Sequence, residues 1–258
     1  MGKRTRNGKC HICGNVGELS SEHVPPKSAF NDKPIILKPF EGGKGKIQQR
    51  GMGDYTLCPS CNRLTSYWYV KSFANFCYMG MEILQRSNGN PKLIYMYQLY
   101  PLRIIKQIIT MMFSANSEVF RDKHPHLTKF VLDKYRKYLN PRYRFWLYYN
   151  YIGEPRFSGV TARANFNNGS SIVFSEITYP PFGYVMTLEN SEKRNDPPDN
   201  RLIEISNFVN YGYNEFDYRE IKAISLPTYL EFPGDYRTSE EIYKDFVKSK
   251  EYTQNKEM

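Results

Sequence analysis

The sequence predicts an α+β protein in which a small module held together by paired cysteines precedes a domain of helices and antiparallel strands. Three observations support this prediction. Two Cys-x-x-Cys pairs lie between Cys10 and Cys61, and apolar residues recur at helical spacing in the middle of the chain. Short runs rich in Val, Ile, Thr, Tyr and Phe follow residue 142. We place the module at residues 1–88 and the second domain at residues 89–258.

Three helices are expected in the middle of the chain. The first spans residues 63–84, where apolar residues recur at roughly helical spacing and no proline occurs. The second spans residues 101–115, because a proline stands at its first turn and four isoleucines with a methionine form one apolar face. The third spans residues 125–139 and ends before Pro141.

The part of the chain after residue 142 has the pattern of an antiparallel sheet. Asn167-Asn168-Gly169 separates two of its β-rich runs and is typical of a hairpin turn. Cations alternate with rings in residues 142–151, a pattern that suits either base stacking or a half-buried strand with tyrosines on its wet face. The expected strands cover residues 143–152, 159–166, 171–177, 184–188, 202–208 and 218–225.

Positive charge gathers at the N-terminal end. The formal net charge is +10, and residues 1–71 carry +7 of it, because 12 of them are basic and five are acidic. This excess favours a polyanionic partner. Within it, residues 38–53 hold five glycines beside Lys44, Lys46 and Arg50, so this segment is either a solvated connector or a loop that contacts phosphates.

Length and hydropathy exclude several classes of protein. No apolar run approaches the roughly 20 residues of a membrane span, and the basic N-terminus leads into Cys10 rather than into the apolar core of a secretion signal. A chain of 258 residues can bury a core without disulfides. We therefore expect no membrane association and a reducing, cytoplasmic location.

The paired cysteines predict a metal site. Cys10 and Cys13 form one pair, and Cys58 and Cys61 form the other. Two such pairs can close a tetrahedral thiolate site around a structural Zn²⁺, with accidental pairs of buried thiols or an iron–sulfur site as the alternatives. His11 could replace one cysteine as a ligand or lie at the surface. The fifth cysteine, Cys77, is expected to be a buried free thiol.

Residues around the cysteine pairs resemble a known nuclease family. Glu22-His23-Val24-Pro25-Pro26 lies between the pairs, and Asn62 follows the last cysteine directly. With the two pairs in this order, residues 1–75 resemble the His-Asn-His endonuclease superfamily. The resemblance implies a zinc-stapled ββα-metal module, followed here by a mixed helical and antiparallel-sheet domain that it does not explain.

The chemistry of phosphodiester hydrolysis agrees with this resemblance. The reaction needs a base that deprotonates water and a cation that stabilises the charge on phosphate and on the leaving oxygen. The resemblance makes His23 the base and makes Glu22 and Asn62 ligands of a catalytic ion, for which their oxygens suit Mg²⁺ or Mn²⁺. The expected contacts to nucleic acid are basic residues: Lys44, Lys46, Arg50 and Arg63.

The chain departs from the family pattern at three points. The family's central asparagine usually stands shortly before the second cysteine pair, where this chain has Asp54, a candidate for orienting His23. Neighbouring side chains of a strand point to opposite faces, so Glu22 and His23 can share a site only if the strand bends or ends there. The family often has histidine where this chain has Asn62.

The sequence-based hypothesis is a metal-dependent endonuclease that acts on DNA, with RNA as a possible substrate. The C-terminal domain would select the substrate, dock a protein partner or join two copies of the chain. By resemblance, restriction or antiphage defence is the biological expectation. The alternative is a zinc-stapled module that binds nucleic acid or protein without catalysis.

Overall fold

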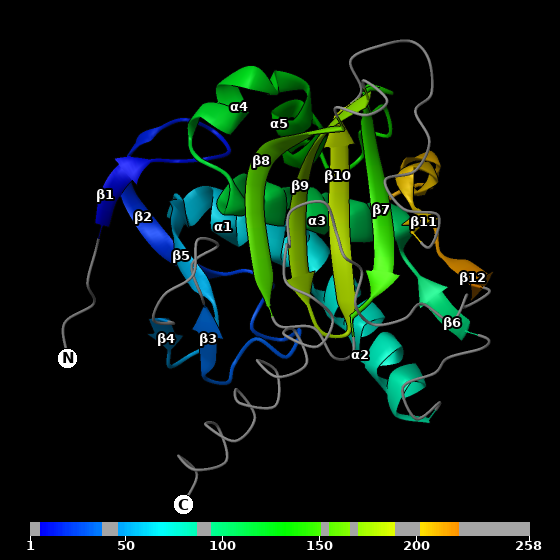
Figure 1. Ribbon diagram of the computed structural model, residues 1–258. Coiled ribbons are helices and arrows are strands. Elements are labelled where there is room, and N and C mark those ends of the chain that lie inside the picture. Colours follow the sequence, from blue (N-terminus) through cyan, green and yellow to red (C-terminus); the bar gives the residue numbers. More distant parts are fainter. Residues whose placement is uncertain are drawn as a thin grey trace, which may run out of the picture.

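The structure, a computed structural model, describes residues 6–37, 46–86, 94–150, 155–165, 170–188 and 202–221. Helices and antiparallel strands both occur along these residues, which confirms the predicted α+β class (Figure 1). Within them, no helix combines the length and the apolar character needed to cross a membrane.

The N-terminal part is a three-stranded antiparallel sheet followed by a helix (Figure 1). Its strands are β1 (Arg6–Lys9), β2 (Val16–His23) and β5 (Gly53–Leu57), in the order β1-β2-β5. Helix α1 (Pro59–Thr65) follows at once, with Cys58 as its N-cap and a proline in its first turn. A small hairpin of β3 (Ile35–Leu37) and β4 (Lys46–Gln48) is inserted before β5. Strand β4 lies within residues 38–53, which were predicted as a loop, and β3 lies directly before them.

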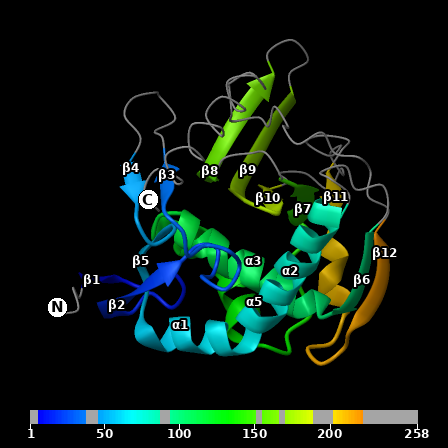
Figure 2. The same ribbon diagram turned by 90° about the horizontal axis from the view of Figure 1, so that it is seen from below.

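The first predicted helix is longer than expected. Helix α1 continues through a π-helical segment, η1 (Ser66–Val70), into α2 (Lys71–Arg86), so the helical stretch begins before residue 63. Helix α3 spans Pro101–Ala115, as predicted. Twelve of its fifteen residues are buried, because it lies between the larger sheet and the N-terminal strands (Figure 2).

The third predicted helix ends early. Helix α4 (Val119–Lys123) precedes α5, which stops at Leu132 (Pro125–Leu132) rather than at residue 139. Lys106 is fully buried on α3, and its ammonium group donates to the carbonyl oxygens of Phe130 and Asp133. These carbonyls therefore find a tertiary partner in place of further helical turns.

The larger sheet has five antiparallel strands in the order β11-β7-β10-β9-β8 (Figure 1). They are β7 (Tyr143–Tyr149), β8 (Arg156–Asn165), β9 (Ser170–Tyr179), β10 (Phe182–Leu188) and β11 (Ile203–Glu204). The predicted turn at residues 167–169 lies outside the described residues, although β8 and β9 pair as it requires.

The strand predicted at residues 202–208 is mostly wrong. Only β11 is extended, and η2 (Ser206–Asn210) is a 3₁₀-helix. The backbone N–H of Phe145 in β7 donates to the side-chain oxygen of Ser206 instead of to a strand carbonyl, which ends the ladder. Strand β12 (Asp217–Ile221) pairs with β6 (Ile94–Leu99), a strand that was not predicted, and residues beyond 221 lie outside the described part.

The hydrophobic core continues from the cysteine pairs to the larger sheet. One cluster of buried side chains includes Cys10 and Leu57 at one end and Phe182 and Phe208 at the other. Residues on both sides of the predicted boundary at 88 and 89 therefore share a core, while the boundary itself stays a prediction.

The aromatic run on β7 is buried on both faces of the sheet. All seven of its residues are buried, so the expectation of tyrosines on a wet face is wrong. On the face away from α3, the Trp146 ring nitrogen donates to Thr187, and the Tyr148 hydroxyl donates to the Glu176 carboxylate at 2.5 Å. These pairs satisfy the polar atoms of Trp146 and Tyr148, whereas the Tyr149 hydroxyl is buried without a hydrogen-bond partner among the described residues.

Candidate active site

The four paired cysteines form one cluster. Cys10 and Cys13 flank the turn after β1, while Cys58 and Cys61 stand at the start of α1. Their sulfur atoms lie within 4.8 Å of one another, and those of Cys13 and Cys58 are 3.7 Å apart. A tetrahedral zinc with Zn–S bonds of about 2.3 Å has S···S edges of about 3.8 Å. The cluster therefore fits a structural zinc ion.

The surroundings favour the thiolate form at Cys10, whereas burial raises the pKa of Cys13 and the hydrogen bond to Cys10 raises the pKa of Cys61. Hydrogen bonding from the Cys61 thiol lowers the pKa of Cys10 to about 4, so this sulfur is in the form that binds metal. His11 is not part of the cluster, since its Nδ1 hydrogen-bonds to the Phe113 carbonyl at 3.0 Å. Cys77 is a buried free thiol outside the cluster, as predicted.

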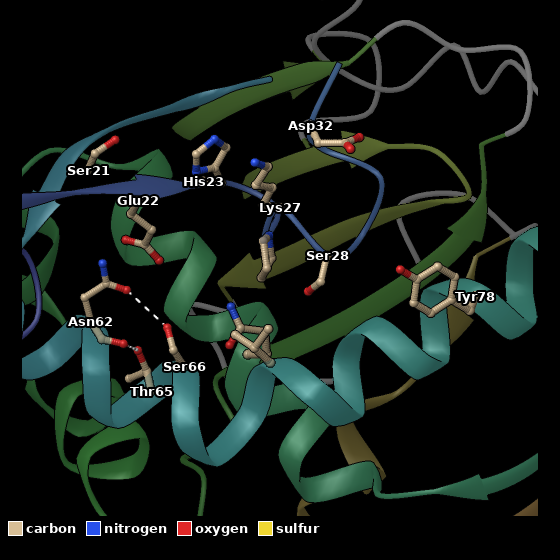
Figure 3. A pocket seen from close by; sticks show the side chains of 13 residues that line it. Ser21, Glu22, His23, Lys27, Ser28, Asp32, Asn62, Thr65, Ser66 and Tyr78 are labelled. Atoms are coloured by element: carbon tan, nitrogen blue, oxygen red, sulfur yellow. Dashed lines mark hydrogen bonds between the residues drawn. The ribbon is translucent and has the colours of Figure 1, made fainter. Parts of the chain in front are cut away.

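A pocket of about 590 Å³ is lined by Asn62, the residue that follows Cys61 of the cysteine cluster (Figure 3). Its wall is built by the end of β2, the loop that follows, α1, η1, α2 and α3. Glu22, His23 and Asn62 all line it. The structure therefore brings together the three residues to which the sequence assigned catalytic roles, although two lie on a strand and one on a helix.

Glu22 is held in a buried position. Its Oε2 accepts hydrogen bonds from Thr56 of β5 at 3.2 Å and from Ser114 of α3 at 2.6 Å. Burial raises the pKa of the carboxyl to about 7, because desolvation disfavours the charged form. Oε1 accepts no hydrogen bond from the described residues, and a cation in the pocket would favour the charged carboxylate.

His23 is the last residue of β2, but it and Glu22 are both still paired with β5, so their side chains point to opposite faces of the strand. Its Nε2 lies 2.9 Å from the carbonyl oxygen of Arg50. A carbonyl only accepts, so Nε2 carries the proton and Nδ1 is left as the basic nitrogen. Glu22 points toward Asn62, whereas His23 lies on the opposite side of β2 (Figure 3).

Asn62 is fixed by hydrogen bonds and by its place in the chain. Its amide nitrogen donates to Ser20 of β2 at 3.0 Å, and its Oδ1 accepts from Ser66 at 3.2 Å (Figure 3). It follows the zinc-ligand candidate Cys61 on α1. A zinc ion in the cluster would thus anchor the helix turn that carries Asn62.

Asn31 supports the segments around the pocket, and the sequence did not predict this role. Its fully buried side chain donates to the carbonyls of Pro25 and Met52, both at 2.7 Å, and accepts from the Met52 backbone N–H at 2.6 Å. Gly51 has a positive φ of 79°, and a Cβ there would clash with the Asn31 carbonyl oxygen. Asn31 therefore ties the loop after His23 to the segment before β5.

Asp54 does not orient His23. It lies opposite Glu22 in the β2–β5 ladder, is exposed, and forms an ion pair with Arg6 at 3.3 Å. The sequence suggested Asp54 because it stands near the second cysteine pair. No spacing rule pointed to Asn31, whose partners are backbone atoms of two separate segments.

Asn31→Leu tests this support. The change leaves two buried backbone groups without partners, the Pro25 carbonyl and the Met52 N–H, because the Met52 carbonyl still accepts from the Val24 N–H. Each such group costs about 1–3 kcal/mol, so we expect the free energy of unfolding to fall by about 2 kcal/mol or more in a urea titration. The matched control, Asn7→Ala at an exposed position of β1, should change it by less than about 0.5 kcal/mol. Equal stability of the two variants would contradict a supporting role for Asn31.

The basic residues predicted to contact nucleic acid are only partly described. Arg50 and Arg63 are exposed, on the loop before β5 and on α1. Lys46 begins β4, and Lys44 lies outside the described residues. Their contact with nucleic acid stays a prediction.

Comparison with protein-family models, with curated proteins and with solved structures found no match to the chain. A functional conclusion therefore depends on the residues and the geometry of the site itself.

Proposed function

We propose that the protein is a metal-dependent endonuclease of the His-Asn-His type that hydrolyses phosphodiester bonds of DNA. The observation that carries the proposal is that Glu22, His23 and Asn62 line one pocket, with Glu22 and Asn62 on one side of β2 and His23 on the other, close to a four-cysteine cluster that fits zinc. A base, a carboxylate and an amide oxygen in one pocket are the groups that metal-assisted hydrolysis of a phosphodiester needs.

His23 would act as the general base. The Arg50 carbonyl holds the Nε2 proton, so Nδ1 is the nitrogen able to take a proton from an attacking water. The same hydrogen bond limits rotation of the ring, which helps to position Nδ1 for proton transfer.

Glu22 and Asn62 would hold the catalytic ion. Their oxygen atoms suit Mg²⁺ or Mn²⁺, which when bound supplies positive charge to the phosphate and to the leaving oxygen. Thr56 and Ser114 orient the Glu22 carboxylate, and Ser20 and Ser66 orient the Asn62 amide. The protein's contribution is to fix both side chains before the substrate arrives.

The charge of the chain favours a nucleic acid as the substrate. Residues 1–71 have a net charge of +7 and include the three catalytic candidates. Positive charge near the pocket attracts a phosphate backbone and steers its approach. Restriction or antiphage defence within the cytoplasm is the biological role that the resemblance favours, with the C-terminal part selecting the substrate or docking a partner or second copy.

The rival function is a zinc-stapled module that binds nucleic acid or protein without catalysis. A cleavage panel separates the two: duplex DNA, single-stranded DNA and RNA, each with Mg²⁺, Mn²⁺ or EDTA, with zinc content measured in every sample. We expect cleavage of DNA that needs Mg²⁺ or Mn²⁺ and stops with EDTA at concentrations that leave the zinc bound. Binding without cleavage under all conditions would favour the rival, and cleavage of RNA alone would correct the substrate.

A further inference from the structure

The pocket extends beyond the three catalytic candidates. Lys27, Ser28 and Asp32 line it from the loop after β2, and Tyr78 lines it from α2, on the far side from Asn62 (Figure 3). The volume of about 590 Å³ lies within the roughly 300–1,000 Å³ of pockets that enclose small-molecule ligands. The pocket therefore has room for a group larger than a phosphate.

Gln107 is an unpartnered polar side chain in this pocket. It lies on α3 and is only 2% exposed, yet its Oε1 is buried without any hydrogen-bond partner among the described residues. Its neighbours on α3 are satisfied, since Lys106 donates to two carbonyls and the Thr110 hydroxyl donates to the Lys106 carbonyl. Buried amide groups almost always have partners, so an unpaired one beside a pocket points to a ligand that pairs with it.

Tyr78 offers an aromatic surface in the same pocket, at the end away from Asn62 (Figure 3). Half of its surface is exposed, and the Phe30 ring meets it edge to face at 5.0 Å. The Tyr179 hydroxyl in turn donates to the Phe30 carbonyl at 3.1 Å. The ring is thus held in place by the body of the protein, as a stacking surface for a base requires.

We propose that this pocket binds a single unstacked nucleotide next to the scissile phosphate, with Gln107 pairing with the base edge and Tyr78 stacking on the base. The inference rests on the proposed function, because the catalytic candidates fix where the phosphate lies. A carboxamide can pair with a base edge through its N–H and C=O groups together. The carboxylate of Asp32, which also lines the pocket, would accept hydrogen bonds from the amino groups of a base and would repel a second phosphate.

This site selects among nucleic acids. In a regular duplex the bases are stacked and paired, so none can enter a pocket unless its nucleotide leaves the helix. The favoured substrate is therefore single-stranded DNA, or a duplex with an unpaired nucleotide at the cleavage position.

Binding to an inactive protein tests the site without depending on catalysis. The His23→Ala protein is titrated in Mg²⁺ against three labelled DNAs: a short single strand, its perfect duplex, and a duplex with one unpaired nucleotide. We expect the first and third to bind about tenfold more tightly than the perfect duplex. In the same background, Gln107→Met and Tyr78→Leu should each weaken single-strand binding roughly tenfold, whereas Tyr78→Phe should retain it.

Stability separates a binding role of Gln107 from a structural one. Removing an unpaired buried acceptor loses no hydrogen bond, so Gln107→Met should keep or raise the melting temperature while it weakens binding. Thr128→Val is the matched control, because Thr128 of α5 also has an unpartnered buried oxygen among the described residues and does not line the pocket. It should leave DNA binding unchanged.

The active parent is assayed on the same DNAs so that two failures can be told apart. Absence of any Mg²⁺- or Mn²⁺-dependent cleavage overturns the proposed function, and the nucleotide site with it. Cleavage combined with equal binding of the three DNAs, or with unchanged single-strand binding in both Gln107→Met and Tyr78→Leu, overturns the nucleotide site alone.

Discussion

Cys58→Ser is expected to release zinc and to unfold the N-terminal sheet together with α1. Serine can still cap the helix, as the Cys58 sulfur does by accepting from the Cys61 N–H at 3.5 Å, so the change mainly removes a metal ligand. Structural zinc contributes about 10–16 kcal/mol of folding free energy in zinc-finger peptides. Because β1, β2 and α1 meet at the cluster, loss of the ion should also remove Asn62 from the pocket.

Zinc content and circular dichroism on heating measure this effect. Cys77→Ser is the matched control, since it removes the one cysteine outside the cluster and should keep the zinc stoichiometry of the parent. A Cys58→Ser protein with one zinc per chain and the melting temperature of the parent would show that the four sulfurs do not hold a structural ion.

His23→Ala is expected to lower the rate of DNA cleavage by about 10²–10⁴-fold, the usual contribution of a general base. The Nε2 hydrogen bond to the Arg50 carbonyl leaves Nδ1 as the nitrogen that, in the proposed mechanism, would accept the proton of the attacking water. The quantity to measure is the single-turnover rate at saturating protein, because it reports the chemical step rather than product release.

A second histidine provides the control for this variant. His126 is exposed on α5 and does not line the pocket, so His126→Ala should cleave at the parental rate. Zinc content and melting temperature of His23→Ala should match those of the parent, which excludes misfolding as the cause of lost activity. Parental activity in a correctly folded His23→Ala protein would remove His23 from the mechanism.

Local sequence patterns predicted most of the fold. The predictions were wrong or missing where an element depends on tertiary contacts with distant residues. Helix α3 was predicted with its bounds because its apolar face and its N-terminal proline are both local signals. The end of α5 depends on Lys106, a residue of another helix, whose contacts with two carbonyls no local pattern reveals. Strand β6 depends on pairing with the distant β12.

The residues of the site were likewise predicted where a local pattern marks them and missed where their role depends on tertiary contacts. Spacing predicted the four-cysteine cluster, and resemblance predicted that Glu22, His23 and Asn62 belong together. Asn31 was missed because its partners are backbone atoms of separate segments. Ser114 and Gln107 were missed because the pattern of α3 indicates burial and does not show which neighbours its polar residues meet.

The most direct test of the central claim is the Mg²⁺ dependence of the single-turnover cleavage rate, measured for the zinc-loaded parent and for Glu22→Gln side by side. We expect the cleavage rate of the parent to rise from zero as the Mg²⁺ concentration increases and then to saturate. Glu22→Gln keeps the size of the side chain but loses its charge. Loss of a residue that only hydrogen-bonds to a metal ligand already lowers metal affinity roughly tenfold. Glu22→Gln should therefore need a more than tenfold higher Mg²⁺ concentration to reach half of its maximal rate. A parental rate that is independent of Mg²⁺, or identical titrations of the two proteins, would contradict a catalytic ion held by Glu22.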